Sequence, residues 1–545
     1  MNNTFLIFLI VISCISCNVN KIEMDNLPNN LYEKNISSYS ANYLAAHYSI
    51  SKGDAYTASK ILDEKIKNTK LLQLKFFSNL MSGKFESAEK VSQKLRLHNI
   101  NKDIYLLPEY ILKIKRNDLR KSLKIFENKR KFFNLDNLNY LIKFWINEAD
   151  KKDNLIHGKH FKQSSIHELL ILENFHNSKK LTKIADLIYN KSNLNSHDLL
   201  LLAGFYYRVK NINKFNNIIK KQLSGQFDKL YIINHFMDTD NMYNKVPNLH
   251  VILASKIYNI INKNNFKVGK QYSYQKILLE FSLYLNPKMD ISRYSLAEIY
   301  NFEETNEIAM KKLDFISDKS FFSLAANLKQ LAIIKSEKVD LKYKTLLFRI
   351  FDIWPENKFV LYRLANYYKS KEKYSKSLKI YKKILKDHKS TDRDLFLYAS
   401  NLDKIGKWNE AKELFLQLLK KNPKDTYTLN YLSYKLALKE QELELALNLI
   451  KKALVLDPEN GYFLDTLGWV EFKRKNYNSA VYFLEKSVSI LPKSSEVMDH
   501  LGDCYLMLNR KKEAFFEWNK ALKYETDTNK KQEIKDKLNK YGYLL

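Results

Sequence analysis

The sequence predicts an all-α protein built as a solenoid of stacked helical hairpins, and two observations carry this prediction. Only 11 glycines and 8 prolines occur among 545 residues, which is below average usage. This scarcity excludes collagen-like and linker-type chains and disfavours a large all-β domain, whose hairpins need turn glycines. The second observation is the spacing of prolines. Successive intervals in the set Pro287, Pro355, Pro423, Pro458 and Pro492 are 68, 68, 35 and 34 residues, which fit a unit of 34 with one insertion.

The clearest unit is 461–494, where Gly468 falls in a first helix and Ala480 in a second. Small residues at these places let two antiparallel helices approach closely, and large ones such as Leu464 fill the space between hairpins. A proline after the second helix ends it. Seven consecutive units fit this pattern: 290–323, 324–357, 358–391, 392–425, 426–460, 461–494 and 495–528.

The remaining segments fit the same plan less closely. Residues 38–289 hold degenerate hairpins of similar kind, with helical periodicity but no 34-residue register between 101 and 195. In 529–545, Ile534, Leu538 and Tyr541 stand at helical spacing in a polar segment. This segment is predicted to be a capping helix that covers the last hairpin.

The repeat pattern resembles the tetratricopeptide repeat (TPR). From the segment Tyr43–Tyr48 to Asp465–Trp469 and Asp499–Asp503, the chain as a whole resembles an alphaproteobacterial TPR lipoprotein family. No biochemical activity is established for that family. The resemblance implies a right-handed superhelix with a concave groove lined by the first helix of each unit.

The N-terminal residues predict export. Residues 1–17 form a signal-like segment with an apolar run from Phe5 to Ile12, too short to span a bilayer. The stretch from Val11 to Cys14 resembles a bacterial lipobox, which implies lipidation of Cys14, with Cys17 as the alternative. Neither cysteine is followed by Asp, which by resemblance implies an outer-membrane lipoprotein facing the periplasm. A soluble periplasmic protein and an uncleaved anchor remain as alternatives, and 18–37 is expected to be a tether.

The charge is strongly positive. Lys and Arg number 91 against 60 Asp and Glu, giving +31, and only 11 of the basic residues are arginine. Arginine is preferred for phosphate and base recognition, and the export signal disfavours nucleic acid as a partner. The lysines either cover solvated helix faces or form a functional surface. The second possibility gives the alternative function, a basic periplasmic protein that binds anionic lipid, lipopolysaccharide or cell-wall polymer.

No motif predicts catalysis, a cofactor or a metal. The chain has no GxGxxG, no P-loop and no GxSxG sequence. His157, His160, His167 and His176 form a histidine cluster, but Ile171 stands where a zincin motif beginning at His167 needs its second histidine. Cys504 is expected to be a buried packing thiol. The sequence therefore favours a protein that is not an enzyme.

The predicted function is a non-catalytic scaffold that binds envelope proteins or peptides in its groove, in envelope biogenesis. Positions 2, 5, 9 and 12 of the first helix point into the groove in TPR proteins. Aromatic residues at these positions suit a peptide with apolar anchors, although Tyr434, Trp469 and Phe472 could instead pack against the neighbouring hairpin. The predicted concave peptide-binding residues are Tyr362, Asn366, Tyr427, Asn430, Tyr434, Tyr462, Asp465, Trp469, Phe472, Asp499 and Asp503.

Overall fold

The all-α prediction is confirmed by a computed structural model of the chain. The part that it describes contains 28 α-helices and no strand, and none of its helices has the length and hydropathy needed to cross a membrane. The predicted signal segment, both candidate lipidation cysteines and the tether lie outside the described residues. The structure describes residues 39–62, 68–98, 100, 103–126, 135–150, 165–190, 194–219, 245–263, 272–336, 340–387 and 390–542.

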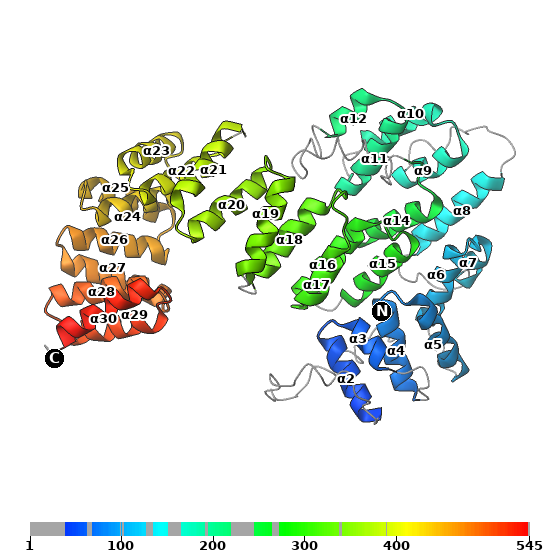
Figure 1. The fold of residues 1–545 in the computed structure, drawn as a ribbon, viewed down its shortest axis with the longest axis horizontal. Helices are drawn as coiled ribbons and strands as arrows, with labels where there is room; N and C mark the ends of the chain where they lie inside the picture. Colours follow the sequence, from blue (N-terminus) through cyan, green and yellow to red (C-terminus); the bar gives the residue numbers. More distant parts are fainter. Residues whose placement is uncertain are drawn as a thin grey trace. The chain divides into compact units, whose positions relative to one another are not determined.

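The chain divides into two compact units, unit 1 over Met1–Val339 and unit 2 over Asp340–Leu545 (Figure 1). The division falls between the two helices of the predicted 324–357 hairpin, so that each unit takes one of them. Unit 1 contains α2 (Tyr39–Ser51), α3 (Ala55–Ile61), α4 (Thr69–Met81), α5 (Phe85–Leu97), η2 (Asp103–Leu106), α6 (Leu107–Lys115), α7 (Leu119–Ile125), α8 (Asp136–Asp150), α9 (Ile166–Phe175), η4 (Ser178–Leu181), α10 (Thr182–Tyr189), α11 (Ser196–Arg208), α12 (Ile212–Ile218), α14 (Leu249–Lys263), α15 (Tyr272–Leu285), α16 (Asp290–Phe302), α17 (Asn306–Asp314) and α18 (Ser323–Ser336).

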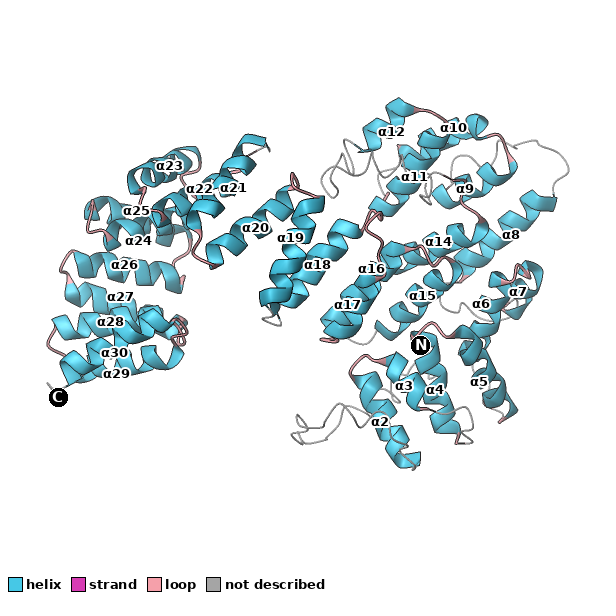
Figure 2. Ribbon diagram, in the orientation of Figure 1, coloured by secondary structure: helices cyan, strands magenta, loops and turns pink. Residues whose placement is uncertain are grey.

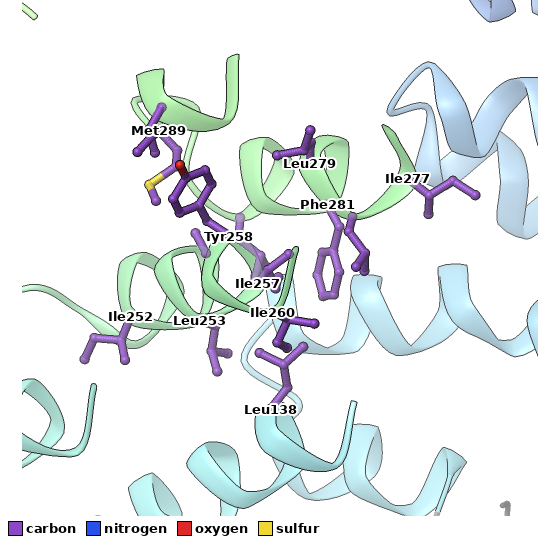
Figure 3. Packing of buried hydrophobic residues seen from close by; sticks show 14 of the residues in the cluster. Leu138, Ile252, Leu253, Ile257, Tyr258, Ile260, Ile277, Leu279, Phe281 and Met289 are labelled. Atoms are coloured by element: carbon purple, nitrogen blue, oxygen red, sulfur yellow. The ribbon is translucent and has the colours of Figure 1, made fainter. Parts of the chain in front are cut away.

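Unit 1 joins helices that are far apart in sequence. Helix α14 packs against both α8 and α9, and its Ile260 lies beside Leu138 of α8 (Figure 3). Helix α15 packs against α4, and the ring of Phe85 at the start of α5 lies 5.0 Å from that of Tyr284. The ammonium of Lys115 donates to the carbonyl oxygen of Tyr284 at 2.8 Å. Contacts of this kind go beyond the nearest-neighbour packing of a regular solenoid.

Unit 2 is regular. After α19 (Asp340–Ile353), first helices of 13 residues alternate with second helices of 14. Figure 2 shows these helices joined by short loops. Pro355, Pro423, Pro458 and Pro492 each lie two residues beyond the end of a helix. The first helices are α20 (Lys358–Ser370), α22 (Asp392–Lys404), α24 (Thr426–Leu438), α26 (Gly461–Lys473) and α28 (Ser495–Met507). The second helices are α21 (Tyr374–Asp387), α23 (Trp408–Lys421), α25 (Leu443–Leu456), α27 (Tyr477–Ile490) and α29 (Lys511–Tyr524), and α30 (Thr528–Gly542) follows them.

The turn inside each hairpin of unit 2 places a residue in the left-handed region two places beyond the first helix, and the α24–α25 turn adds a second one, Glu442 at φ +45°. The five residues two places beyond the first helices recur at intervals of 34 or 35 with φ between +53° and +83°. Only one of the five is glycine, so glycine spacing alone does not reveal this repeat. The turn has the same geometry because the left-handed residue reverses the chain between two antiparallel helices. The five residues are Glu372, Gly406, Glu440, Lys475 and Asn509.

Two glycines allow the paired helices to pack closely. A Cβ added at Gly502 of α28 would stand 2.5 Å from ring atoms of Trp518 on α29. At Gly468 of α26 it would stand 2.6 Å from Leu484 Cγ on α27. Such distances are well below van der Waals contact, which accounts for the absence of a side chain at both places.

Candidate functional site

The first helices form the inner side of unit 2 over its last three hairpins. Helix α24 packs against α26, and α26 against α28, whereas no two consecutive second helices in the described part pack as closely. The hydroxyl of Tyr434 on α24 even donates to Glu496 Oε1 on α28, 2.6 Å away and two hairpins further along. Shorter distances between first helices mean that the stack curves toward them. The concave face therefore belongs to α24, α26 and α28, which carry most of the predicted site residues.

Trp469 lies at the centre of an aromatic stack within this face. Its ring is 4.0 Å from His500 at an interplanar angle of 18°, and 4.8 Å from Phe472 at 8°. The ammonium of Lys473 lies 5.1 Å from the ring centroid. Only 7% of Trp469 is exposed. Of the two interpretations that the sequence leaves open, packing against the neighbouring hairpin describes this residue.

Carboxylates surround the buried imidazole of His500. Its Nδ1 lies 2.9 Å from Asp465 Oδ1. The ring of Tyr434 lies 6.2 Å from the imidazole, and its hydroxyl donates to Glu496. Burial lowers the pKa of His500, but Asp465, Glu496 and Asp499 raise it more, so that the pKa is raised overall. Burial and the nearby carboxylates also raise the pKa of Tyr434, which keeps its hydroxyl protonated as a donor.

The raised pKa of His500 predicts a dependence of stability on pH. The stabilisation by the imidazolium is complete below the unfolded pKa of about 6.5 and is lost as pH rises through the higher folded pKa. Amide hydrogen exchange in α26 and α28 should therefore become faster, beyond its intrinsic pH dependence, from pH 6.5 upward. His500→Gln should abolish this excess. An identical profile in the variant would mean that another group titrates.

A lysine of the capping helix forms ion pairs with two further carboxylates of this face. The ammonium of Lys537 on α30 lies 2.8 to 2.9 Å from both oxygens of Asp499 and both oxygens of Asp503. Trp518 Nε1 also donates to Asp503 Oδ1 at 3.1 Å. Burial lowers the pKa of Lys537, but the two carboxylates raise it more, so the lysine stays charged. Asp499 and Asp503 thus serve the packing of α30.

The other predicted site residues are more accessible. Tyr427 at the start of α24 is 80% exposed, and Tyr462 at the corresponding place in α26 is 62% exposed. Asn366 is exposed and its Oδ1 accepts a hydrogen bond from Tyr381 at 3.1 Å. Tyr362 and Asn430 are half-buried. The predicted set therefore separates into an internal cluster and a line of exposed residues.

The internal cluster contains His500 and Lys537, which are not among the residues predicted from the sequence. His500 stands one place after a groove position, and Lys537 lies 34 residues after Asp503. Extending the repeat register into α30 could have found the lysine. The contact between Tyr434 and Glu496 spans 62 residues, and no repeat interval indicates it.

The described residues hold no group of three or more His, Cys, Asp or Glu side chains that could bind a metal ion. His176 Nε2 lies 3.0 Å from Glu148 Oε2, and His167 is buried in α9. His157 and His160 lie outside the described part. Cys504 is buried, and burial raises the pKa of its thiol, as expected of a packing residue.

The helical pairs and their curved inner face define the class of protein, an α-solenoid of stacked hairpins. Comparison with known proteins supports a particular repeat. Residues 395–425 match the family model of the tetratricopeptide repeat. A stretch of 127 residues is 31% identical to TPR repeat-containing protein MJ1428 of Methanocaldococcus jannaschii, covering 23% of this chain and 22% of that protein. The mitochondrial import receptor subunit TOM70 of Mus musculus is 26% identical over 143 residues, which is 26% of this chain and 23% of that protein.

The chain therefore contains a tetratricopeptide repeat at residues 395–425, and the comparisons support a tetratricopeptide-repeat protein. It spans less than a quarter of the length of the curated relatives that it matches. Among solved structures, yeast Tom70 is similar over 93% of this chain and 96% of its own, with 12% identity and a TM-score of 0.35. MamA from Desulfovibrio magneticus RS-1 is similar over 30% and 93%, with 18% identity and a TM-score of 0.27. Tetratricopeptide-repeat proteins are typically non-catalytic scaffolds that bind proteins or peptides.

Proposed function

We propose that the chain is a non-catalytic scaffold of the bacterial cell envelope that holds a segment of a partner protein along the inner face of unit 2. The single observation that carries the proposal is the pair of exposed rings Tyr427 and Tyr462. They occupy the same position on neighbouring first helices, 35 residues apart, and are 80% and 62% exposed. Tyrosine is among the residue types that contribute most to the binding energy of protein interfaces. Two exposed tyrosines at equivalent positions can therefore anchor a bound segment.

The state of the carboxylates indicates what kind of segment would fit. Asp465 is paired with His500, and Glu496 accepts a hydrogen bond from Tyr434. Asp499 and Asp503 are both paired with Lys537. Charge on this face is therefore largely neutralised within the protein. A partner would gain most from apolar contact with the tyrosine rings and from hydrogen bonds to their hydroxyls. We infer a segment with apolar anchors and little net charge.

A pull-down comparison tests this proposal. The double variant Tyr427→Ala, Tyr462→Ala should lose at least about 90% of the captured partner, because interface tyrosines contribute about 2 kcal/mol each when they are hot spots. The matched control is Tyr482→Ala, which removes a ring that is 51% exposed on the second helix α27. It should retain the partner. Equal retention of the partner by the wild type, the double variant and Tyr482→Ala would contradict a binding site on the inner face.

The location in the envelope is a separate part of the proposal. It is supported by the signal-like residues 1–17 and by the lipobox that ends at Cys14. We propose an outer-membrane lipoprotein that faces the periplasm. Metabolic labelling with a clickable fatty acid should label the wild type and Cys17→Ser but not Cys14→Ser. Labelling of the wild type and of Cys14→Ser, but not of Cys17→Ser, would place the acyl chain on Cys17. No labelling of the wild type would contradict the anchor.

A further inference from the structure

The positive charge of unit 2 is concentrated in one hairpin. Residues 358–387, which form α20 and α21, contain ten lysines and arginines and only two carboxylates, a net charge of +8. The next four hairpins, 392–421, 426–456, 461–490 and 495–524, each carry a net charge of 0 or +1. A general excess of lysine along the chain would not produce such a contrast. The α20–α21 hairpin therefore differs from the following hairpins in its net charge.

Five lysines of this hairpin form a single stripe along α21. At 100° per residue they fall within an arc of about 120°. The opposite side of the helix buries Ser377, Tyr381 and Ile384 completely. The helix is thus amphipathic, with one side in the core and the other covered by ammonium groups. The lysine stripe consists of Lys376, Lys379, Lys382, Lys383 and Lys386.

Most of the lysine stripe lacks a counter-charge within the protein. Lys383 pairs with Glu356 at 2.6 Å, and the ammonium of Lys376 lies 5.6 Å from the ring centroid of Tyr368. Lys379, Lys382 and Lys386 are exposed and have no carboxylate within 4 Å in the described part of the chain. No Asp or Glu occurs between 373 and 386. Uncompensated charges on one helix face attract an anionic surface.

We propose that the lysine stripe of α21 docks unit 2 on an anionic phospholipid membrane. The side chains on the stripe are all lysine, which acts as a point charge, whereas nucleic-acid surfaces combine arginine with aromatic rings for stacking. The stripe runs along a straight helix face for about 15 Å, a shape that a plane of headgroups can meet. It lies on a second helix, so the membrane and a partner segment on the first helices occupy different helices of the repeat.

Vesicle binding tests this inference with the full chain, carrying Cys14→Ser and Cys17→Ser throughout so that no acyl chain contributes. The protein with an unchanged lysine stripe should cosediment with vesicles of 30 mol% phosphatidylglycerol in phosphatidylcholine and not with pure phosphatidylcholine. Binding should fall steeply between about 50 and 300 mM salt. Each lysine near an anionic surface contributes about fivefold. Lys376→Gln, Lys379→Gln, Lys382→Gln and Lys386→Gln together should therefore weaken binding by at least about 100-fold.

A charge-matched control separates the lysine stripe from net charge. Lys420→Gln, Lys451→Gln, Lys452→Gln and Lys512→Gln remove four exposed lysines from the second helices α23, α25 and α29. This variant should lose less than about tenfold. Equal loss in the two variants, binding to pure phosphatidylcholine, or tighter stripe-dependent binding to a single-stranded oligonucleotide than to the vesicles would each overturn the proposal.

Discussion

Gly502→Ala should open the last hairpin of unit 2. The new methyl group would stand 2.5 Å from the indole of Trp518, and that ring cannot retreat. It is 1% exposed, its Nε1 is bonded to Asp503, and Tyr541 stacks on it. Overpacking of this kind costs about 3 kcal/mol. Hydrogen exchange should show protection in α28, α29 and α30 falling by about two orders of magnitude while unit 1 stays protected.

Gly406→Ala is the matched control. Nothing lies within 4 Å of a Cβ at Gly406, but its φ is +83°, so the change adds only backbone strain of about 1 kcal/mol. Wild-type protection of α28 and α29 in Gly502→Ala would mean that these two helices can separate without loss, contrary to the packing described.

Trp469→Ala should destabilise α26 and α28 by about 3 to 5 kcal/mol, the range for removing a fully packed indole. The change removes the ring that lies between His500 and Phe472 and leaves a cavity on the inner face. Tyr462→Ala on the same helix removes a ring that is 62% exposed, and it should change stability by less than about 0.5 kcal/mol. Urea denaturation followed by hydrogen exchange in α26 distinguishes the two variants.

A small effect of Trp469→Ala on stability, combined with loss of a partner, would show that this ring serves binding rather than packing. Because the ring is buried, Trp469→Ala is a poor probe of recognition. Tyr427 and Tyr462 are the better probes, since their removal leaves the core intact.

The fold could be predicted from the sequence where the repeat is regular. Pro423, Pro458 and Pro492 mark the ends of second helices, and Gly468 and Gly502 mark close helix contacts, because both residue types have a narrow set of structural roles. Unit 1 could not be predicted to the same depth. Its helices α4 and α15 pack together although almost 200 residues separate them. No repeat spacing in the sequence indicates such a contact.

The sequence predicts which positions lie on the inner face, but it does not predict which of their side chains are exposed and which are buried. The repeat register places Tyr427 and Trp469 on the same face, yet one ring is exposed and the other is stacked between two neighbours. The difference depends on His500, which fills the space beside Trp469, and on the curvature that brings Tyr434 to Glu496. Both effects arise from packing between hairpins, and the residue pattern within one hairpin does not indicate such packing.

Site-specific photocrosslinking tests the central claim most directly. A benzophenone amino acid would replace Tyr427, Tyr462 or, as the outward control, Tyr482 in the full chain expressed in its own host. We expect a crosslinked protein of one defined mass from positions 427 and 462 and none from 482. The same adduct from all three positions, or adducts from 482 alone, would contradict a binding face on the first helices of unit 2.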